Sequence, residues 1–154
     1  MSKTAEAKQL VSKLRQLVSD VELPGEPDFL KDGVLLLFLK SRNWDLRSSE
    51  QMLRKALNWR KEIQPRTLQC DQCHWNPGCH SLRQIGHDET GRPVLYASFF
   101  PAHPSQRNSL NGALVHLIFV IENAIRSMLS DVNQWVFVID CASKFLYFES
   151  HYTR

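Results

Sequence analysis

Apolar residues recur at helical spacing through residues 1–64 and predict three helices. The first is expected over residues 3–19, the second over residues 29–41, and the third ends before Pro65, because proline cannot continue a helix. The second is apolar around most of its circumference, which predicts that it is the buried helix of a small bundle. In the third, Ser48 is the expected N-cap, because Gln51 completes a capping-box pattern three residues later. Its predicted buried stripe comprises Met52, Ala56, Trp59 and Ile63, flanked by Leu53 and Leu57.

After residue 81 the pattern becomes that of strands. Residues 81–85 and 94–100 are expected to form a hairpin around the turn residues 86–92. Residues 135–139 form a continuous apolar run, which is typical of a strand buried on both faces. Between them, a long helix is predicted from residue 108 or 109 to about residue 129, with its apolar face made of Leu110, Leu114, Leu117, Ile118, Ile121, Ala124, Ile125 and Met128.

These elements predict an α/β protein. An N-terminal three-helix bundle is assigned to residues 1–64, and a linker that contains cysteine and histidine to residues 65–81. Residues 82–154 are assigned to an incomplete sheet made of a β-hairpin, a long helix and a buried strand. The strand–helix–strand order predicts a βαβ unit.

Three separated motifs occur in an order that resembles the CRAL-TRIO family of retinaldehyde, tocopherol and phosphatidylinositol carriers. They are the helical stretch 29–63, the run Gly86-His87-Asp88-Glu89-Thr90-Gly91-Arg92-Pro93-Val94, and Val136-Phe137-Val138-Ile139-Asp140. The resemblance implies a sheet with helices over it, a cavity for one hydrophobic ligand, and a mobile helix that gates the cavity at a membrane. After Asp140 the sequence matches the family's pattern less well. We therefore expect a truncated lipid-binding part that binds lipid weakly and transfers none.

The apolar positions of this second half are candidates for the wall of a lipid cavity. Cavity walls and ordinary cores share a composition, so plain core packing stays open as the alternative for each of them. We find no nucleophile–base arrangement, and therefore expect no enzymatic activity. The predicted lipid-binding residues are Tyr96, Phe99, Phe100, Ile118, Ile121, Phe137 and Ile139.

A second constellation lies in residues 70–80. Two thiols in a C-x-x-C spacing can reach one tetrahedral metal ion, and Cys79 with either His74 or His80 can complete the four ligands. Zinc is therefore a candidate cofactor, with reduced thiols that bind no metal, or a redox pair, as the alternatives. A c-type haem attachment at C-x-x-C-H would need an export route, and we see no export signal. His116 is assigned no chemistry, and the predicted metal ligands are Cys70, Cys73, Cys79 and His80.

Composition excludes some classes of binding partner. The net charge of +3 is too small to imply nucleic acid, and a signal core or an apolar run of ~20 residues is absent. We expect a cytoplasmic protein, either free or peripheral on intracellular membranes, whose four cysteines are reduced or metal-bound. One cluster of basic residues is either a solvated face or a docking surface for anionic membranes. It comprises Lys40, Arg42, Arg47, Arg54, Lys55, Arg60 and Lys61.

Together these observations predict non-catalytic binding of a hydrophobic lipid or phospholipid, with transient contact to an anionic membrane surface. The alternative is a protein-interaction scaffold, zinc-stapled or not, in which a protein partner pairs with the unfinished edge of the sheet.

Overall fold

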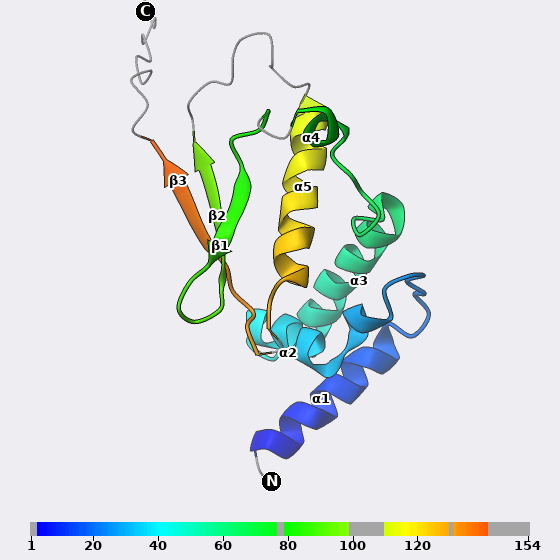
Figure 1. The fold of residues 1–154 in the computed structure, drawn as a ribbon. Coiled ribbons are helices and arrows are strands. Elements are labelled where there is room, and N and C mark those ends of the chain that lie inside the picture. The colour runs from blue at the N-terminus through cyan, green and yellow to red at the C-terminus, as the bar shows by residue number, and fades with distance from the viewer. Residues whose placement is uncertain (1–2, 77–78, 99–109, 130, 142–154) are drawn as a thin grey trace, which may run out of the picture. The chain divides into compact units, whose positions relative to one another are not determined.

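The computed structural model describes residues 3–76, 79–98, 110–129 and 131–141 (Figure 1). The chain divides into two compact units, residues 1–64 and residues 65–154.

The first unit contains the three predicted helices. They are α1 (Lys3–Leu17), α2 (Asp32–Ser41) and α3 (Leu46–Ile63), with a short 3-10 helix, η1 (Pro27–Leu30), before α2. Helix α2 was expected to be the buried helix of the bundle, and only one stripe of it is fully buried: Leu35 and Leu39 are buried whereas Leu37 is exposed. A helix on the surface of a small bundle turns only one stripe inward. The core of the unit is formed by Val11, Leu14, Val18, Leu35, Leu39, Leu53 and Leu57.

Helix α3 differs from the prediction in its cap and in its buried stripe. The N-cap is Asp45, whose Oδ1 accepts a hydrogen bond from the Ser48 backbone N–H at 2.8 Å. Trp59, placed in the predicted stripe, is 41% exposed. The buried stripe runs instead through Ser49, Leu53, Leu57 and Arg60.

Two polar residues complete that stripe because their polar atoms have partners. The Ser49 hydroxyl donates to the Asp45 carbonyl oxygen at 2.7 Å. Arg60 Nε lies 2.6 Å from Glu26 Oε2, and the two side chains are only 9% and 5% exposed. The Arg60 guanidinium also stacks over the Phe29 ring at 4.6 Å. Buried polar groups satisfied in this way are compatible with a core, although their sequence pattern suggests a surface.

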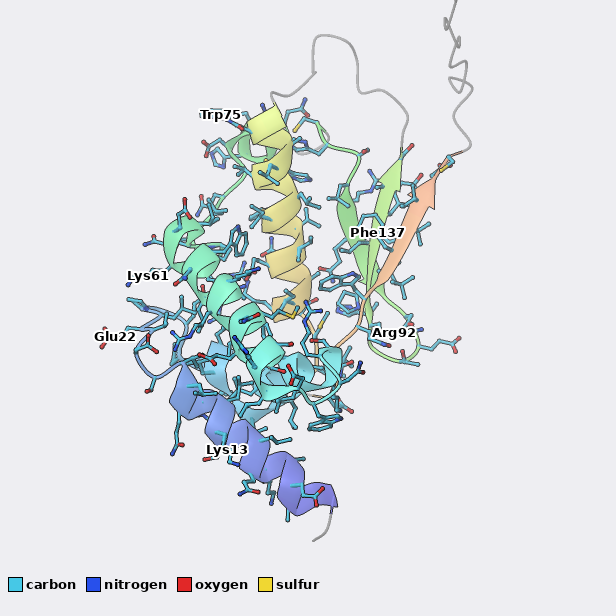
Figure 2. The ribbon with its side chains drawn as sticks, turned by 180° about the vertical axis from the view of Figure 1, so that it is seen from behind. Lys13, Glu22, Lys61, Trp75, Arg92 and Phe137 are labelled. Atoms are coloured by element: carbon cyan, nitrogen blue, oxygen red, sulfur yellow. The ribbon has the colours of Figure 1, made fainter. Side chains whose placement is uncertain are left out.

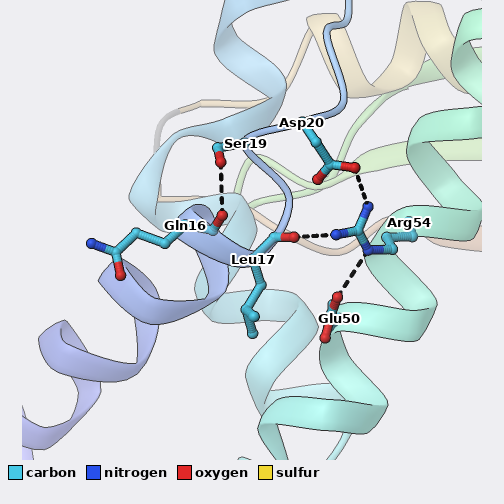
Figure 3. A network of polar contacts seen from close by, with 6 residues as sticks. All are labelled: Gln16, Leu17, Ser19, Asp20, Glu50 and Arg54. Atoms are coloured by element: carbon cyan, nitrogen blue, oxygen red, sulfur yellow. Dashed lines mark hydrogen bonds and ion pairs between the residues drawn. The ribbon is translucent and has the colours of Figure 1, made fainter.

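A polar network on the surface of this unit joins α3 to the end of α1 (Figure 3). Arg54 lies 2.8 Å from Asp20 Oδ2 and 2.9 Å from Glu50 Oε1, and it also donates to the Leu17 carbonyl oxygen. Arg54 and Arg60, both counted in the predicted docking cluster, are therefore engaged in ion pairs within the unit. The remaining five members of the cluster, Lys40, Arg42, Arg47, Lys55 and Lys61, are exposed.

The second unit is a three-stranded sheet with helices. Its elements are α4 (Asp71–Trp75), β1 (Arg83–His87), β2 (Pro93–Ser98), α5 (Leu110–Arg126) and β3 (Val136–Asp140). The strand order is β1-β2-β3, with β1 antiparallel and β3 parallel to β2. The predicted hairpin and βαβ unit are therefore confirmed. Among the helices that the structure describes, none is both long enough and apolar enough to cross a bilayer.

Strand β3 was expected to be buried on both faces, and it is not. Phe137 is 43% exposed and Ile139 is 52% exposed. The physical reason is position: β3 is an edge strand of the described sheet, and α5 packs against β1 and β2. The described core of this unit is Leu95 with Val120 and Ala124 of α5.

The hairpin loop is organised by one carboxylate. Asp88 Oδ1 accepts hydrogen bonds from the backbone N–H groups of Thr90 and Arg92 at 3.0 and 2.9 Å, and Oδ2 lies 2.7 Å from Arg92 Nε. Gly91 has a φ of 78°, which a residue with a side chain rarely adopts. This is the physical role of the aspartate and the second glycine in the G-H-D-E-T-G-R-P-V run.

Candidate functional site

Of the seven residues predicted to bind lipid, five lie in the part of the chain that the structure describes; Phe99 and Phe100 lie outside it. Ile118 and Ile121 are half-buried on α5, and Ile121 packs against the core. Phe137, labelled in Figure 2, and Ile139 stand on the exposed edge strand β3.

The pleat of the sheet separates Tyr96 from the other two strand residues. Leu95 pairs with Phe137 and Ala97 pairs with Ile139, so these four side chains share one face. Leu95 packs against α5, so this is the face that α5 covers. Tyr96 therefore points to the opposite face.

On that opposite face Tyr96 has polar partners. Its hydroxyl donates to Asp140 Oδ2 at 2.7 Å, and the Arg83 guanidinium lies 5.5 Å from its ring centroid. The hydrogen bond to Asp140 raises the pKa of Tyr96, so the hydroxyl stays protonated. Asp140 is therefore a cross-strand partner of this tyrosine. The predicted lipid-binding set is thus divided between two faces of the sheet.

A pocket of about 210 Å³ lies beside α5 in the same unit. Ligand pockets for drug-sized molecules are typically about 300–1,000 Å³, so this one is small. None of the five described lipid candidates lines it; its described lining is Cys73, His80, Leu82, Arg83, Gln84, His116, Phe119, Val120 and Asn123.

One end of this pocket is a cluster of cysteine and histidine side chains. Cys70 immediately precedes α4, and Cys73 follows one helical turn later. The Cys70 Sγ atom is 3.2 Å from His80 Nε2, and the Cys73 Sγ atom is 3.4 Å from His116 Nδ1. The two imidazole rings stack at 3.7 Å with an interplanar angle of 13°. All four ligand atoms lie within 4.8 Å of one another.

The structure therefore brings together three of the four predicted ligands. Cys79 is buried near Cys73, but it is outside the group of four. His116, for which no chemistry was predicted, takes that place. The signal that could have found it is its spacing: His116, Val120 and Ala124 are four residues apart and are all buried on α5.

Burial sets the charge of this cluster. Desolvation lowers the pKa of both His80 and His116, and the proximity of the two rings lowers that of His80 further. Desolvation, with the neighbouring Cys70 thiol, raises the pKa of Cys73 to about 12. In the absence of a cation, the imidazoles are neutral and this thiol is protonated at pH 7.

Comparison with known proteins finds similarity in the second unit. Residues 81–148 match the family model of the CRAL/TRIO domain. A CRAL-TRIO domain-containing protein of Schizosaccharomyces pombe is 31% identical over 74 residues, which cover 42% of this chain and 17% of that protein. The SEC14 cytosolic factor of Candida glabrata is 35% identical over 88 residues, which cover 54% of this chain and 29% of that protein. The chain thus spans less than a third of either relative. The match over residues 81–148 confirms the resemblance to the CRAL-TRIO family for the two motifs that lie within this segment.

Proposed function

We propose that this protein binds one hydrophobic lipid or phospholipid without covalent chemistry, through residues 81–148. The observation that carries the proposal is the CRAL/TRIO match over this segment, because the resemblance implies lipid carriers.

The apolar surface of β3 supports the proposal. Phe137 and Ile139 are half exposed. They lie on the same face of the sheet that α5 covers at β1 and β2. Apolar side chains in that position gain free energy when an apolar partner removes them from water. A lipid tail contributes ~0.8 kcal/mol for each methylene that it buries. A chain of many methylenes can therefore compete with the bilayer for such a surface.

The first test is native mass spectrometry of the purified protein, followed by denaturing lipid extraction of the same sample. We expect a lipid-sized mass that leaves on denaturation. A protein that carries no lipid, and that also fails to bind a fluorescent phosphatidylcholine analogue, would contradict the proposal.

Two isoleucines offer a matched pair of variants for this test. Ile139 on β3 and Ile85 on β1 are 52% and 56% exposed, so either can be replaced by asparagine at a similar cost in folding. Ile139→Asn should lose most of the bound lipid, whereas Ile85→Asn should retain it. Equal retention in both variants would remove β3 from the binding surface.

Contact with an anionic membrane surface is a second part of the proposal. Lys40, Arg42, Arg47, Lys55 and Lys61 are exposed on the first unit, and each basic residue near such a surface contributes ~1 kcal/mol. Binding to vesicles of phosphatidylserine and phosphatidylcholine should therefore weaken as salt is added. We infer a cytoplasmic protein that is transiently peripheral on membranes.

The edge position of β3 favours one alternative. In the described sheet, β3 has β2 on one side and no strand on the other, and an exposed edge can accept a strand from a partner. A protein that comes out of purification without lipid and binds another protein through this edge would support an interaction scaffold over a lipid carrier.

A further inference from the structure

We propose that Cys70, Cys73, His80 and His116 bind one zinc ion, which fixes the segment before β1 to helix α5. The proposal concerns the second unit alone and is independent of lipid binding. The ligand set differs from the one expected from the sequence, because His116 and not Cys79 is the fourth ligand.

The distances between the four side chains suit a tetrahedral ion. Zn–S bonds of about 2.3 Å and Zn–N bonds of about 2.0–2.1 Å place the ligand atoms of such a site about 3.3–3.8 Å apart. Two of the cysteine–histidine distances are 3.2 and 3.4 Å, and every pair among the four atoms is within 4.8 Å. Small side-chain rotations would bring all four atoms onto one ion.

The orientation of His116 provides an independent argument. Its Nε2 atom lies 2.8 Å from the Leu82 backbone carbonyl oxygen. A carbonyl oxygen only accepts, so Nε2 carries the proton, and the lone pair of the neutral ring is on Nδ1. That atom is the one that faces Cys73. A ring whose second nitrogen donates to a backbone carbonyl is the usual arrangement of a zinc-bound histidine.

The local backbone explains how the two thiols come together. The backbone N–H groups of Cys73 and His74 both donate to the Cys70 carbonyl oxygen, at 3.0 and 3.3 Å, which forms the first turn of α4. A C-x-x-C pair on such a turn can present both sulfur atoms to one ion. His74 itself is exposed and packs edge-on against Trp75, which is labelled in Figure 2.

The chemistry of these four side chains favours zinc over other metals and a structural role over a catalytic one. Two thiolates and two imidazoles in tetrahedral geometry are the ligands that zinc prefers. Four protein ligands leave no open position for substrate, so the ion would stabilise the fold and would not catalyse a reaction. It would join three places: the α4 turn, His80 just before β1, and α5. Zinc binding would also keep both thiols from pairing as a disulfide.

The test is metal analysis of the reduced, purified protein, together with a titration by Co²⁺ alone. We expect one zinc per chain, and with Co²⁺ the absorption of a tetrahedral site that includes thiolate-to-cobalt charge transfer. Cys73→Ser and His116→Asn should each weaken metal binding at least about tenfold, a typical loss even for a residue that only supports a ligand. Cys79→Ser and His74→Ala are the matched controls and should bind as the unchanged protein does.

A variant in which histidine replaces one cysteine ligand separates loss of metal binding from loss of folding. Cys73→His should retain one Co²⁺ per chain and lose about half of the charge-transfer intensity, because one thiolate of two remains. Two results would overturn the proposal. One is a protein that binds neither Zn²⁺ nor Co²⁺ at micromolar concentration. The other is loss of metal in Cys79→Ser with retention in His116→Asn, which would restore the ligand set expected from the sequence.

Discussion

The two units of this chain are stabilised in different ways. In the helical unit, seven core residues from the three helices and the turn after α1 are at most 3% exposed. In the sheet unit, the described core comprises Leu95, Val120 and Ala124, while β3 leaves Phe137 and Ile139 half exposed. The helical unit therefore relies on apolar packing. The described part of the sheet unit has a smaller apolar core, to which directed polar contacts are added, such as the Asp88 loop and the His116–Leu82 hydrogen bond.

The exception within the helical unit is its buried ion pair, and breaking it should have the largest effect. Replacing Glu26 by alanine leaves Arg60 as a buried charge without its carboxylate. The free energy of unfolding of this unit should fall by about 3–5 kcal/mol, because such a charge is poorly solvated. Urea unfolding monitored by hydrogen exchange in α3 would measure it. As a control, Glu26→Leu combined with Arg60→Met should cost much less, and an equal loss would argue against this explanation.

A matched pair of leucines tests the comparison directly. Leu53 in the helical unit and Leu95 in the sheet unit are both fully buried. Either replacement by alanine should lower the free energy of unfolding by about 2–5 kcal/mol. We expect Leu53→Ala in the upper half of this range and Leu95→Ala in the lower half, because the sheet unit has half-exposed neighbours that can shift into the cavity. Hydrogen exchange resolved by unit would measure both, and the reverse order would contradict the comparison.

Two glycines should respond to alanine in opposite directions. Gly91 has a φ of 78°, and an added Cβ would lie 3.3 Å from Leu129 Cδ1, so Gly91→Ala should destabilise the sheet unit by about 1–2 kcal/mol. Gly33 lies in α2 with nothing within 4 Å of an added Cβ, so Gly33→Ala should stabilise the helical unit by about 0.5–1 kcal/mol. Thermal unfolding of the two variants would show the opposite signs. Unchanged stability in Gly91→Ala would contradict the explanation from its positive φ, and a loss in Gly33→Ala would contradict the prediction for α2.

The smallest expected effect is a pH dependence of the hairpin loop. Hydrogen bonds from Arg92 hold the pKa of Asp88 well below its ordinary value. The stabilisation is therefore fully present above the unfolded pKa of about 3.9 and is lost as the pH falls below it. Asp88→Asn should flatten the fall in stability between about pH 4 and pH 2. An unchanged profile, measured by hydrogen exchange of the hairpin amides, would show that Asp88 does not contribute.

The sequence predicts local structure better than it predicts burial. Helical periodicity, the hairpin turn and the βαβ order were all readable from neighbouring residues. The stripe of α3 was misplaced because Ser49 and Arg60 are buried through partners that the pattern does not reveal. The burial of strand β3 was predicted wrongly because an apolar run has the same sequence pattern in the middle of a sheet and at its edge. Each error concerns contacts between elements.

The same limit applies to the candidate site. The spacing of Cys70, Cys73 and His80 identified three members of the cluster. The fourth, His116, is 36 positions after His80, and only the packing of α5 brings it near. The lipid-binding set stays a prediction, and the pleat has already divided it between two faces.

The parallel pairing of β2 with β3 has a consequence for the order of folding. Val94 pairs with Val136, 42 positions further along the chain, whereas the β1–β2 hairpin closes over a loop of a few residues. Closing a long loop costs conformational entropy before any contact offsets it, so the hairpin should form on the microsecond scale and β3 should dock later. Until it does, the apolar edge of β2 is open to strands of other chains. The rate at which α5 carries β3 into place would then determine how much newly made protein aggregates.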